Sequence, residues 1–262
     1  MNLIDTHCHI CMHRFNDDRD EVIQRMHDAG LVNAIVISDP AEENNVRDAR
    51  ALSDSHDFLY WACGVHPENA DKWNAETEAI VREALAHPKC VALGEIGLDY
   101  YWKENPPHEV QHETMIAQLK IAHELNMPAV LHIRDSHGDT TDILTRAKAE
   151  GWLPQVILHC YSGSWESAKQ YLSLGAYISF TGTVTFSNAP KIQEVASKMP
   201  ADLILVETDS PFIAPVPMRG KRNEPAFVAH TCAKIAELRG ISAEEMGDIT
   251  TENAKRVFRI PE

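Results

Sequence analysis

Short apolar runs alternate with longer amphipathic stretches along nearly the whole chain, and this alternation limits the possible folds more than any other feature. Eight such runs occur, near residues 2–7, 33–38, 59–65, 90–95, 128–133, 155–160, 176–181 and 202–208. Runs such as AIVIS and QVILHC are apolar on both faces, as strands of a buried parallel sheet are. Regular alternation of such strands with helices predicts repeated βαβ units and an α/β fold.

The stretches between the runs have the periodicity of helices that cover a sheet. Residues 109–126 carry one apolar stripe at spacings of four, three and three, formed by Met115, Leu119, Ala122 and Leu125. A second stretch, residues 17–29, is closed by Gly30, a typical helix-ending residue. We expect helices at these positions on the outside of the sheet.

Eight units of this kind predict a closed (β/α)8 TIM-type barrel. An open, doubly wound sheet is the alternative, but such a sheet normally carries a glycine-rich phosphate loop after an early strand. Neither GxGxxG nor GxxxxGKS/T occurs in the chain, so the barrel is favoured. Residues 1–262 contain no linker, low-complexity segment or charge block, and we expect them to form a single domain.

The composition is that of a globular protein, with 262 residues of which 44% are hydrophobic and 24% are charged. No stretch approaches the roughly 18 unbroken apolar residues of a membrane span, and the N-terminus lacks the order of a secretory signal. We therefore expect a cytoplasmic protein without a membrane partner, and no obligate protein partner is evident. A formal net charge of -15 argues against broad contact with duplex nucleic acid but leaves room for a small phosphate site.

Residues of the types that bind metals stand at the C-terminal ends of the predicted strands. They are His7 and His9 in IDTHCHI, Glu95 in VALGEIG, His132 in AVLHIRD, His159 in VILHCYSG and Asp209 in LILVETDSP. Residues two apart on a strand point to the same side, so the two histidines of the first motif can aim at one point. In a (β/α)8 barrel the loops at this end converge on one mouth, where active sites are built. The six side chains are therefore expected to form one cluster.

Four histidines and two carboxylates at the same end of the barrel predict metal binding, because burying such groups without partners costs several kcal/mol. A closed structural zinc site needs four ligands, so six nitrogen and oxygen ligands indicate two divalent ions with open positions. Glu95 can bridge the ions through its two oxygens, and two such ions can activate a water for hydrolysis. Imidazole suits zinc while oxygen ligands suit magnesium or manganese, so all three metals stay open.

Cys8 and Cys11 in CHIC form an alternative thiolate or redox site, although no second cysteine pair accompanies them.

Several motifs together resemble the TatD family of metal-dependent hydrolases. They are DTHCHI, GVHP, GEIGLDY, HIRD, HCYSG, ETDSPF and RNEP, and they cover nearly the whole chain. The resemblance implies an amidohydrolase-type barrel, a metal-dependent deoxyribonuclease activity and, as metal ligands, the six strand-end residues named above. HCYSG carries Tyr161 where phenylalanine is common, a change expected to affect the substrate wall more than the metals.

Further side chains near the cluster are candidates for catalysis. Glu95 and Asp209 are expected to act in catalysis as well as in metal binding. Glu207 of ETDSPF can orient a ligand or a bound water, and His66 of GVHP can donate a hydrogen bond near the metals or the phosphate. Asp99 of GEIGLDY is expected to fix its loop.

Substrate contacts are expected from Arg134, Tyr161, Arg222 and Asn223. Arg222 and Asn223 begin RNEP after the predicted eighth strand. Arg134 lies two residues after His132 and points to the same side if the strand continues. A guanidinium grips two phosphate oxygens at once, so the two arginines are the candidates for a phosphate clamp.

The leading hypothesis is hydrolysis of DNA by a metal-activated water at a dinuclear site, on accessible ends or single strands. An amidohydrolase or esterase acting on a small molecule is the alternative, because the same ions would polarise a carbonyl. A metal-binding protein that has lost activity is a third hypothesis, which the intact ligand set argues against. Basic residues at the mouth favour a phosphate substrate, and an apolar mouth favours a small acyl substrate.

Overall fold

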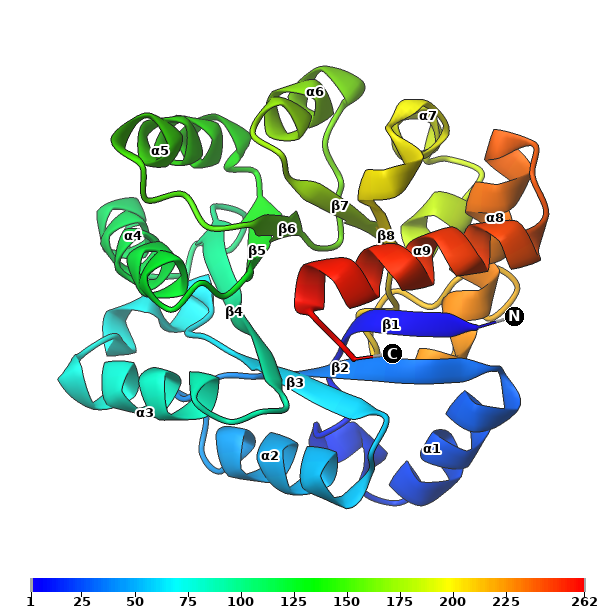
Figure 1. Ribbon diagram of the computed structural model, residues 1–262, viewed down its shortest axis with the longest axis horizontal. Coiled ribbons are helices and arrows are strands. Elements are labelled where there is room, and N and C mark those ends of the chain that lie inside the picture. Colours follow the sequence, from blue (N-terminus) through cyan, green and yellow to red (C-terminus); the bar gives the residue numbers. More distant parts are fainter. Residues whose placement is uncertain (1, 262) are drawn as a thin grey trace.

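The computed structural model describes residues 2–261, which contain one sheet of eight parallel strands in the order β1 to β8 (Figure 1). The strands are β1 (Leu3–Cys8), β2 (Leu31–Ser38), β3 (Leu59–Cys63), β4 (Cys90–Asp99), β5 (Ala129–Arg134), β6 (Val156–Leu158), β7 (Tyr177–Phe180) and β8 (Ile204–Val206). Every predicted apolar run overlaps one of these strands, and the predicted (β/α)8 barrel is confirmed.

Helices follow the strands and, apart from the last one, form the outer ring of the barrel (Figure 1). The α-helices are α1 (Arg19–Asp28), α2 (Asn45–Ser55), α3 (Ala75–Leu85), α4 (His108–Glu124), α5 (His137–Glu150), α6 (Trp165–Ser173), α7 (Pro190–Lys198), α8 (Val228–Arg239) and α9 (Ala243–Phe258). The 3₁₀ helices of the connections are η1 (His13–Phe15), η2 (Pro67–Lys72), η3 (Gly182–Thr185), η4 (Ala201–Leu203) and η5 (Pro225–Phe227).

The two helices singled out in the sequence both form. Helix α1 ends just before Gly30, whose φ of 84° is one that glycine adopts easily. Helix α4 buries Met115, Leu119 and Ala122 as predicted. Leu125 differs from the prediction and is 39% exposed, because α4 has already ended and this residue caps it.

The barrel closes between β1 and the segment that follows β8. The backbone N–H of His9 donates to the carbonyl of Ser210 at 2.8 Å, and the N–H of Asp209 donates to the carbonyl of His7 at 2.9 Å. Cys8 and Ser210 form a parallel bridge between them. The seam of the barrel therefore brings the first and last metal-type residues of the sequence side by side.

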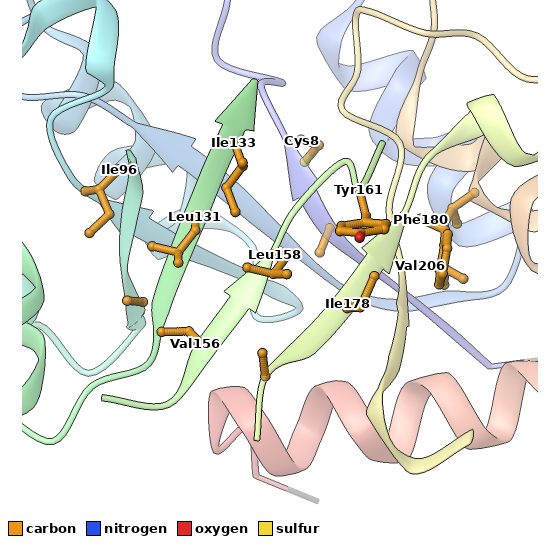
Figure 2. Close-up of a cluster of buried hydrophobic side chains, with 14 of the residues drawn as sticks. Cys8, Ile96, Leu131, Ile133, Val156, Leu158, Tyr161, Ile178, Phe180 and Val206 are labelled. Carbon is orange, nitrogen blue, oxygen red and sulfur yellow. The ribbon is translucent and has the colours of Figure 1, made fainter. Parts of the chain in front are cut away.

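Two apolar clusters hold the strands in place. One joins strand residues such as Ile4 and Val130 to Phe258 of α9, the helix that lies across the barrel in Figure 1. The other packs the strands against the outer helices, and Figure 2 shows part of it around Leu158 and Ile178. Full burial of a side chain of this size contributes roughly 1.5–3 kcal/mol. The polar strand ends thus rest on a rigid, well-packed base.

No helix within residues 2–261 is long and apolar enough to cross a membrane. The cytoplasmic location, the single domain over residues 1–262 and the lack of an obligate protein partner stay predictions.

Candidate metal centre

The structure brings all six predicted ligands together toward the C-terminal ends of the strands, with Glu95 inside β4 and not at its end. They come from β1 and the residues just after it (His7, His9), from β4 (Glu95), from β5 (His132) and from the segments after β6 and β8 (His159, Asp209). His7, Glu95 and His159 are buried, whereas the other three are partly exposed.

One oxygen of Glu95, Oε2, faces the histidines of the first strand. It lies 3.1 Å from Nε2 of His7, and that atom is 3.2 Å from Nε2 of His9. Oδ1 of Asp209 lies 3.3 Å from Nε2 of His9 and 3.8 Å from Nε2 of His7. In a tetrahedral site with bonds of about 2.1 Å, neighbouring donor atoms are about 3.4 Å apart. The spacing and chemistry of these four donors therefore fit one divalent ion.

The other oxygen of Glu95, Oε1, faces a second set of imidazoles. It lies 2.7 Å from Nε2 of His159, 2.8 Å from Nδ1 of His132 and 3.5 Å from Nε2 of His66. The rings of His7 and His159 stack with centroids 4.0 Å apart, which joins the two sets. One carboxylate thus turns its two oxygens to two groups of nitrogen donors, an arrangement that suits a bridging ligand.

Two further carboxylates, both 1% exposed, hold the imidazoles of the second set. Oδ2 of Asp99 lies 2.9 Å from Nε2 of His132, and Oε1 of Glu207 lies 3.2 Å from Nδ1 of His159. The same oxygen of Glu207 accepts the backbone N–H of Cys160 at 2.6 Å. An imidazole that donates one N–H to a carboxylate presents its other nitrogen as a lone pair, which is the form that binds a metal.

His66 differs from the other histidines of the cluster because the ring nitrogen that carries its proton faces Glu95. Its Nδ1 accepts the backbone N–H of Glu68 at 3.2 Å, so the neutral ring carries its proton on Nε2, which points to Glu95. The backbone N–H of His66 donates in turn to Oδ2 of Asp39 at 3.1 Å. The ring is therefore arranged as a hydrogen-bond donor to the cluster, which differs from the lone-pair form of a ligand.

The position of Glu95 in its strand departs from the sequence prediction. The apolar run predicts that the fourth strand ends at Glu95, but β4 continues for four more residues. The register between β4 and β5 shifts between Leu93 and Ile96, around this residue. At Gly97, with a φ of 141°, a Cβ would lie 2.0 Å from the carbonyl oxygen of His132. Only glycine permits this approach of the two strands, which keeps Glu95 close to His132.

Three non-glycine residues beside the cluster have left-handed backbone conformations. They are Asp135, Cys160 and Asp209, with φ values of 56°, 44° and 54°. Such conformations cost about 1–3 kcal/mol each and persist only where the surrounding structure holds them. Their concentration at three strand ends is typical of a functional site.

The charges of the cluster depend on one another. Burial opposes ionisation of Glu95, but the imidazoles of His159 and His7 outweigh burial and hold the pKa of this carboxyl well below its usual range. Burial also opposes protonation of His159, yet Glu95 and Glu207 raise the pKa of this imidazole well above its usual value. At His7 burial dominates, and the pKa is lowered. The buried carboxylates thus need positive charge between them, which a divalent cation supplies.

A cavity of about 680 Å³ opens onto the cluster. Its wall includes carboxylates, Asp39, Glu42 and Glu68, as well as the ring of Trp102. Arg134 is the one Lys or Arg side chain among the lining residues within 2–261. The size is that of an ordinary ligand site, and the wall combines these acidic groups with apolar side chains such as Met12, Ile37 and Ile213.

Arg222, by contrast, is engaged outside this cavity. Its guanidinium donates to both carboxylate oxygens of Asp18, at 2.8 and 2.6 Å, and to the carbonyl of Arg14 at 2.7 Å. It also lies over the ring of Phe15, 4.5 Å from its centre. A phosphate contact of the kind predicted requires this ion pair to open.

Two other predicted substrate contacts are buried. Asn223 is fully buried and donates to the carbonyls of Thr208 and Phe212, so it fixes the segment after β8. Tyr161 is 3% exposed, lies among apolar side chains in Figure 2, and donates its hydroxyl to the carbonyl of Ser164. Neither side chain lines the cavity, and backbone carbonyls already accept the hydrogen bonds that the two side chains donate.

The alternative cysteine site finds no support among residues 2–261. All six are free, and Sγ of Cys8 points to the carbonyl of Ile35 at 3.4 Å. Burial raises the pKa of Cys11 to about 11 and that of Cys160 to about 12. Within residues 2–261, the groups that could hold a metal ion contain no cysteine.

Comparison with known proteins identifies the family. The profile described as TatD related DNase matches residues 4–259. The chain belongs to the TatD family. It is 41% identical to "Uncharacterized metal-dependent hydrolase YabD" of Bacillus subtilis, over 98% of this chain and 99% of that protein. It is 35% identical to the "3'-5' ssDNA/RNA exonuclease TatD" of a Rahnella strain, over 94% of each. The solved structure of YJJV, a TatD homolog from Escherichia coli K12, matches with a TM-score of 0.90 and 34% identity, covering 99% and 98% of the two chains.

The resemblance seen in the motifs is confirmed, and this TatD-family chain is a metal-dependent hydrolase.

Sequence reasoning missed Asp39, which follows β2 directly and accepts from the side chain of Asn69 at 2.9 Å as well as from His66. The strand-end rule applied to AIVISD would have found it. No comparable signal marks Trp102, because it lies on a loop without periodicity.

Proposed function

We propose that this chain hydrolyses phosphodiester bonds in nucleic acid, DNA in particular, at accessible ends or single strands and with two divalent ions. The observation that carries the proposal is the placement of Glu95. Its Oε1 lies within 3.5 Å of three imidazoles, and its Oε2 lies 3.1 Å from His7. A carboxylate in this position suits a pair of ions about 3.5–4 Å apart.

Two such ions, whether magnesium, manganese or zinc, supply activation of a water and neutralisation of charge on the phosphate. His7, His9 and Asp209 would hold one of them, His132 and His159 the other, with Glu95 between the two.

The chain's own side chains supply the remaining steps. The Asp209 side chain is 13% exposed and lines the cavity, so it can take the proton that the attacking water loses. His66 carries its proton on Nε2 and can donate it in a hydrogen bond to a phosphate oxygen or to the departing oxygen. Glu207 keeps the ring of His159 in position.

The nucleic-acid substrate is supported by Arg134 and by the relatives. Arg134 lines the cavity and can grip a phosphate close to the metal ligands. The Rahnella relative is named a 3'-5' ssDNA/RNA exonuclease, and the matching profile is described as TatD related DNase.

A small-molecule amidohydrolase or esterase is the second candidate. Apolar side chains, among them Met12, Ile37 and Ile213, line the same cavity, and such a wall suits a small acyl substrate. The same ions would polarise a carbonyl as readily as a phosphoryl group.

A screen of metals against substrates decides between the candidates. Purified protein would be loaded with magnesium, manganese or zinc and given single-stranded DNA, nicked duplex, blunt duplex, and chromogenic esters and amides. We expect cleavage of single-stranded DNA with at least one metal, loss of activity in EDTA and recovery when the metal is returned. Ready turnover of esters or amides, with every DNA left intact under all three metals, would replace the proposal by the second candidate.

A further inference from the structure

Two large aromatic side chains stand exposed beside the cavity, on the loop between β4 and α4. Tyr101 is 51% exposed and Trp102 is 47% exposed, and their rings meet edge to face with centroids 4.8 Å apart. Trp102 lines the cavity that opens onto the metal-type cluster. Because burial of such rings is strongly favourable, an exposed pair at the mouth of a cavity indicates a surface that a ligand covers.

Arg134 extends this aromatic surface toward the cluster. Its guanidinium carbon lies 3.8 Å from the centre of the Tyr101 ring and 5.5 Å from that of Trp102. Among residues 2–261 no carboxylate or other acceptor pairs with this guanidinium, so its N–H groups are available to a ligand. We call Tyr101, Trp102 and Arg134 the rim stack.

The loop of the rim stack is fastened to the metal-type cluster by Asp99. Oδ1 of Asp99 accepts the backbone N–H groups of Tyr101 and Trp102, at 2.9 and 3.4 Å. Its Oδ2 contacts His132 at 2.9 Å. One carboxylate thus fixes the distance between the aromatic surface and the metal ligands, so the surface is in place before a ligand binds.

We propose that the rim stack binds one unpaired nucleobase next to the phosphate that is hydrolysed. This inference rests on the proposed function. An unpaired base offers an open π face to Trp102, and the guanidinium of Arg134 can contact the adjoining phosphate while it stays stacked on Tyr101. A base inside a duplex has both faces covered by its neighbours, so the subsite selects single strands and frayed ends.

The charge of the cavity makes stacking the main source of affinity. Asp39, Glu42 and Glu68 lie on its wall, and in the described part of the chain Arg134 is the one cationic side chain of the lining. Binding along a phosphate backbone depends on many cations, which this wall does not offer. Base stacking does not depend on charge and accepts any of the bases.

The test combines removal of the ring with removal of the base. Wild type and Trp102→Ala would be compared on a single-stranded oligonucleotide and on matched oligonucleotides with abasic sites at successive positions near the cleaved end. Trp102→Phe, which keeps a ring, serves as the rescue variant. Trp152→Ala is the matched control, because Trp152 also has a cation, Lys120, 5.4 Å from its ring but does not line the cavity.

We expect Trp102→Ala to lower kcat/KM on the normal strand on the order of 10- to 100-fold, mainly through KM. On the strand that lacks the stacked base, kcat/KM of the wild type should fall by a similar factor. The kcat/KM of Trp102→Ala should fall little further, because this variant has already lost the stacking. Trp102→Phe and Trp152→Ala should stay near wild type. Binding of the same oligonucleotides to metal-free protein, followed by fluorescence anisotropy, should show the same pattern without turnover.

The outcomes separate the two levels of the hypothesis. If wild type cleaves no nucleic acid with any of the three metals, the proposed function fails and this inference fails with it. If wild type cleaves single strands but base removal affects wild type and Trp102→Ala equally at every position, the proposed function stands and the rim stack is not the base subsite.

Discussion

The floor of the cavity and its rim are built in different ways. On the floor, His7, Glu95 and His159 are at most 6% exposed, and Glu95 lies 3.1 and 2.7 Å from the imidazole nitrogens of the other two. On the rim, Tyr101 and Trp102 are about half exposed and lie on a loop. The strands and the opposite charges of its side chains hold the floor, whereas two hydrogen bonds to Asp99 and stacking on Arg134 hold the rim. A change in the floor should therefore affect every substrate, while a change in the rim should depend on what is bound.

The largest effect is expected from Glu95→Gln on the floor. Glutamine keeps the shape of the side chain but removes the negative charge that faces both sets of imidazoles. Loss of an outer carboxylate typically costs 10- to 100-fold in metal affinity or activity, so loss of the central one should cost more than about 100-fold. Elemental analysis should show a lower metal content. Full activity with unchanged metal stoichiometry would contradict the bridging role, and a circular-dichroism melt checks that the variant folds.

A second prediction compares neighbouring residues of the first strand motif. His9→Ala removes an Nε2 donor that lies 3.3 Å from Asp209, and we expect metal affinity to fall by at least about 10-fold. Cys8→Ser should change it much less, because the thiol of Cys8 points to the carbonyl of Ile35 and away from the cluster. Titration of metal-free protein with zinc measures both. A larger loss from the cysteine change would indicate thiolate ligation through CHIC.

Asp99→Asn sharpens the comparison because Asp99 belongs to both regions. An amide in place of this carboxylate can keep its oxygen toward the N–H groups of Tyr101 and Trp102, but its NH₂ group cannot accept from His132. We expect roughly 10- to 100-fold lower metal affinity or kcat. The sensitivity of KM to an abasic site should persist, since the rim stays anchored. Loss of that sensitivity with normal metal binding would show that Asp99 serves the loop alone.

Strand ends obey periodic rules, so the sequence could predict that the metal-type residues of the floor meet at one end of the barrel. His132 and Arg134 lie two apart on β5 and both line the cavity, as alternation predicts, although Ile133 between them lines it too. The position of Glu95 inside β4 depends on a local register shift, which no pattern of apolar residues reveals. The pairing of Arg222 with Asp18 joins two loops that are distant in the sequence, so it emerges only when the barrel closes. Motifs thus indicated which residues matter without showing whether a charge is already paired.

The smallest effect is expected from substitution of Arg222. Comparing this substitution with that of Arg134 tests whether an arginine that is already paired can still bind the substrate phosphate. Partly exposed ion pairs such as Arg222 with Asp18 contribute about 0–1 kcal/mol, so Arg222→Ala should shift the melting temperature slightly and change KM on single-stranded DNA only a few-fold. Arg134→Ala should raise KM by about 10-fold. It should also remove about one phosphate contact, so the slope of log affinity against log salt concentration should become shallower by roughly 0.7 for a single strand. Metal content should stay unchanged in both variants. If Arg222→Ala gives the larger rise in KM and the change in salt slope, the ion pair with Asp18 opens on binding, and the phosphate clamp predicted from RNEP is correct.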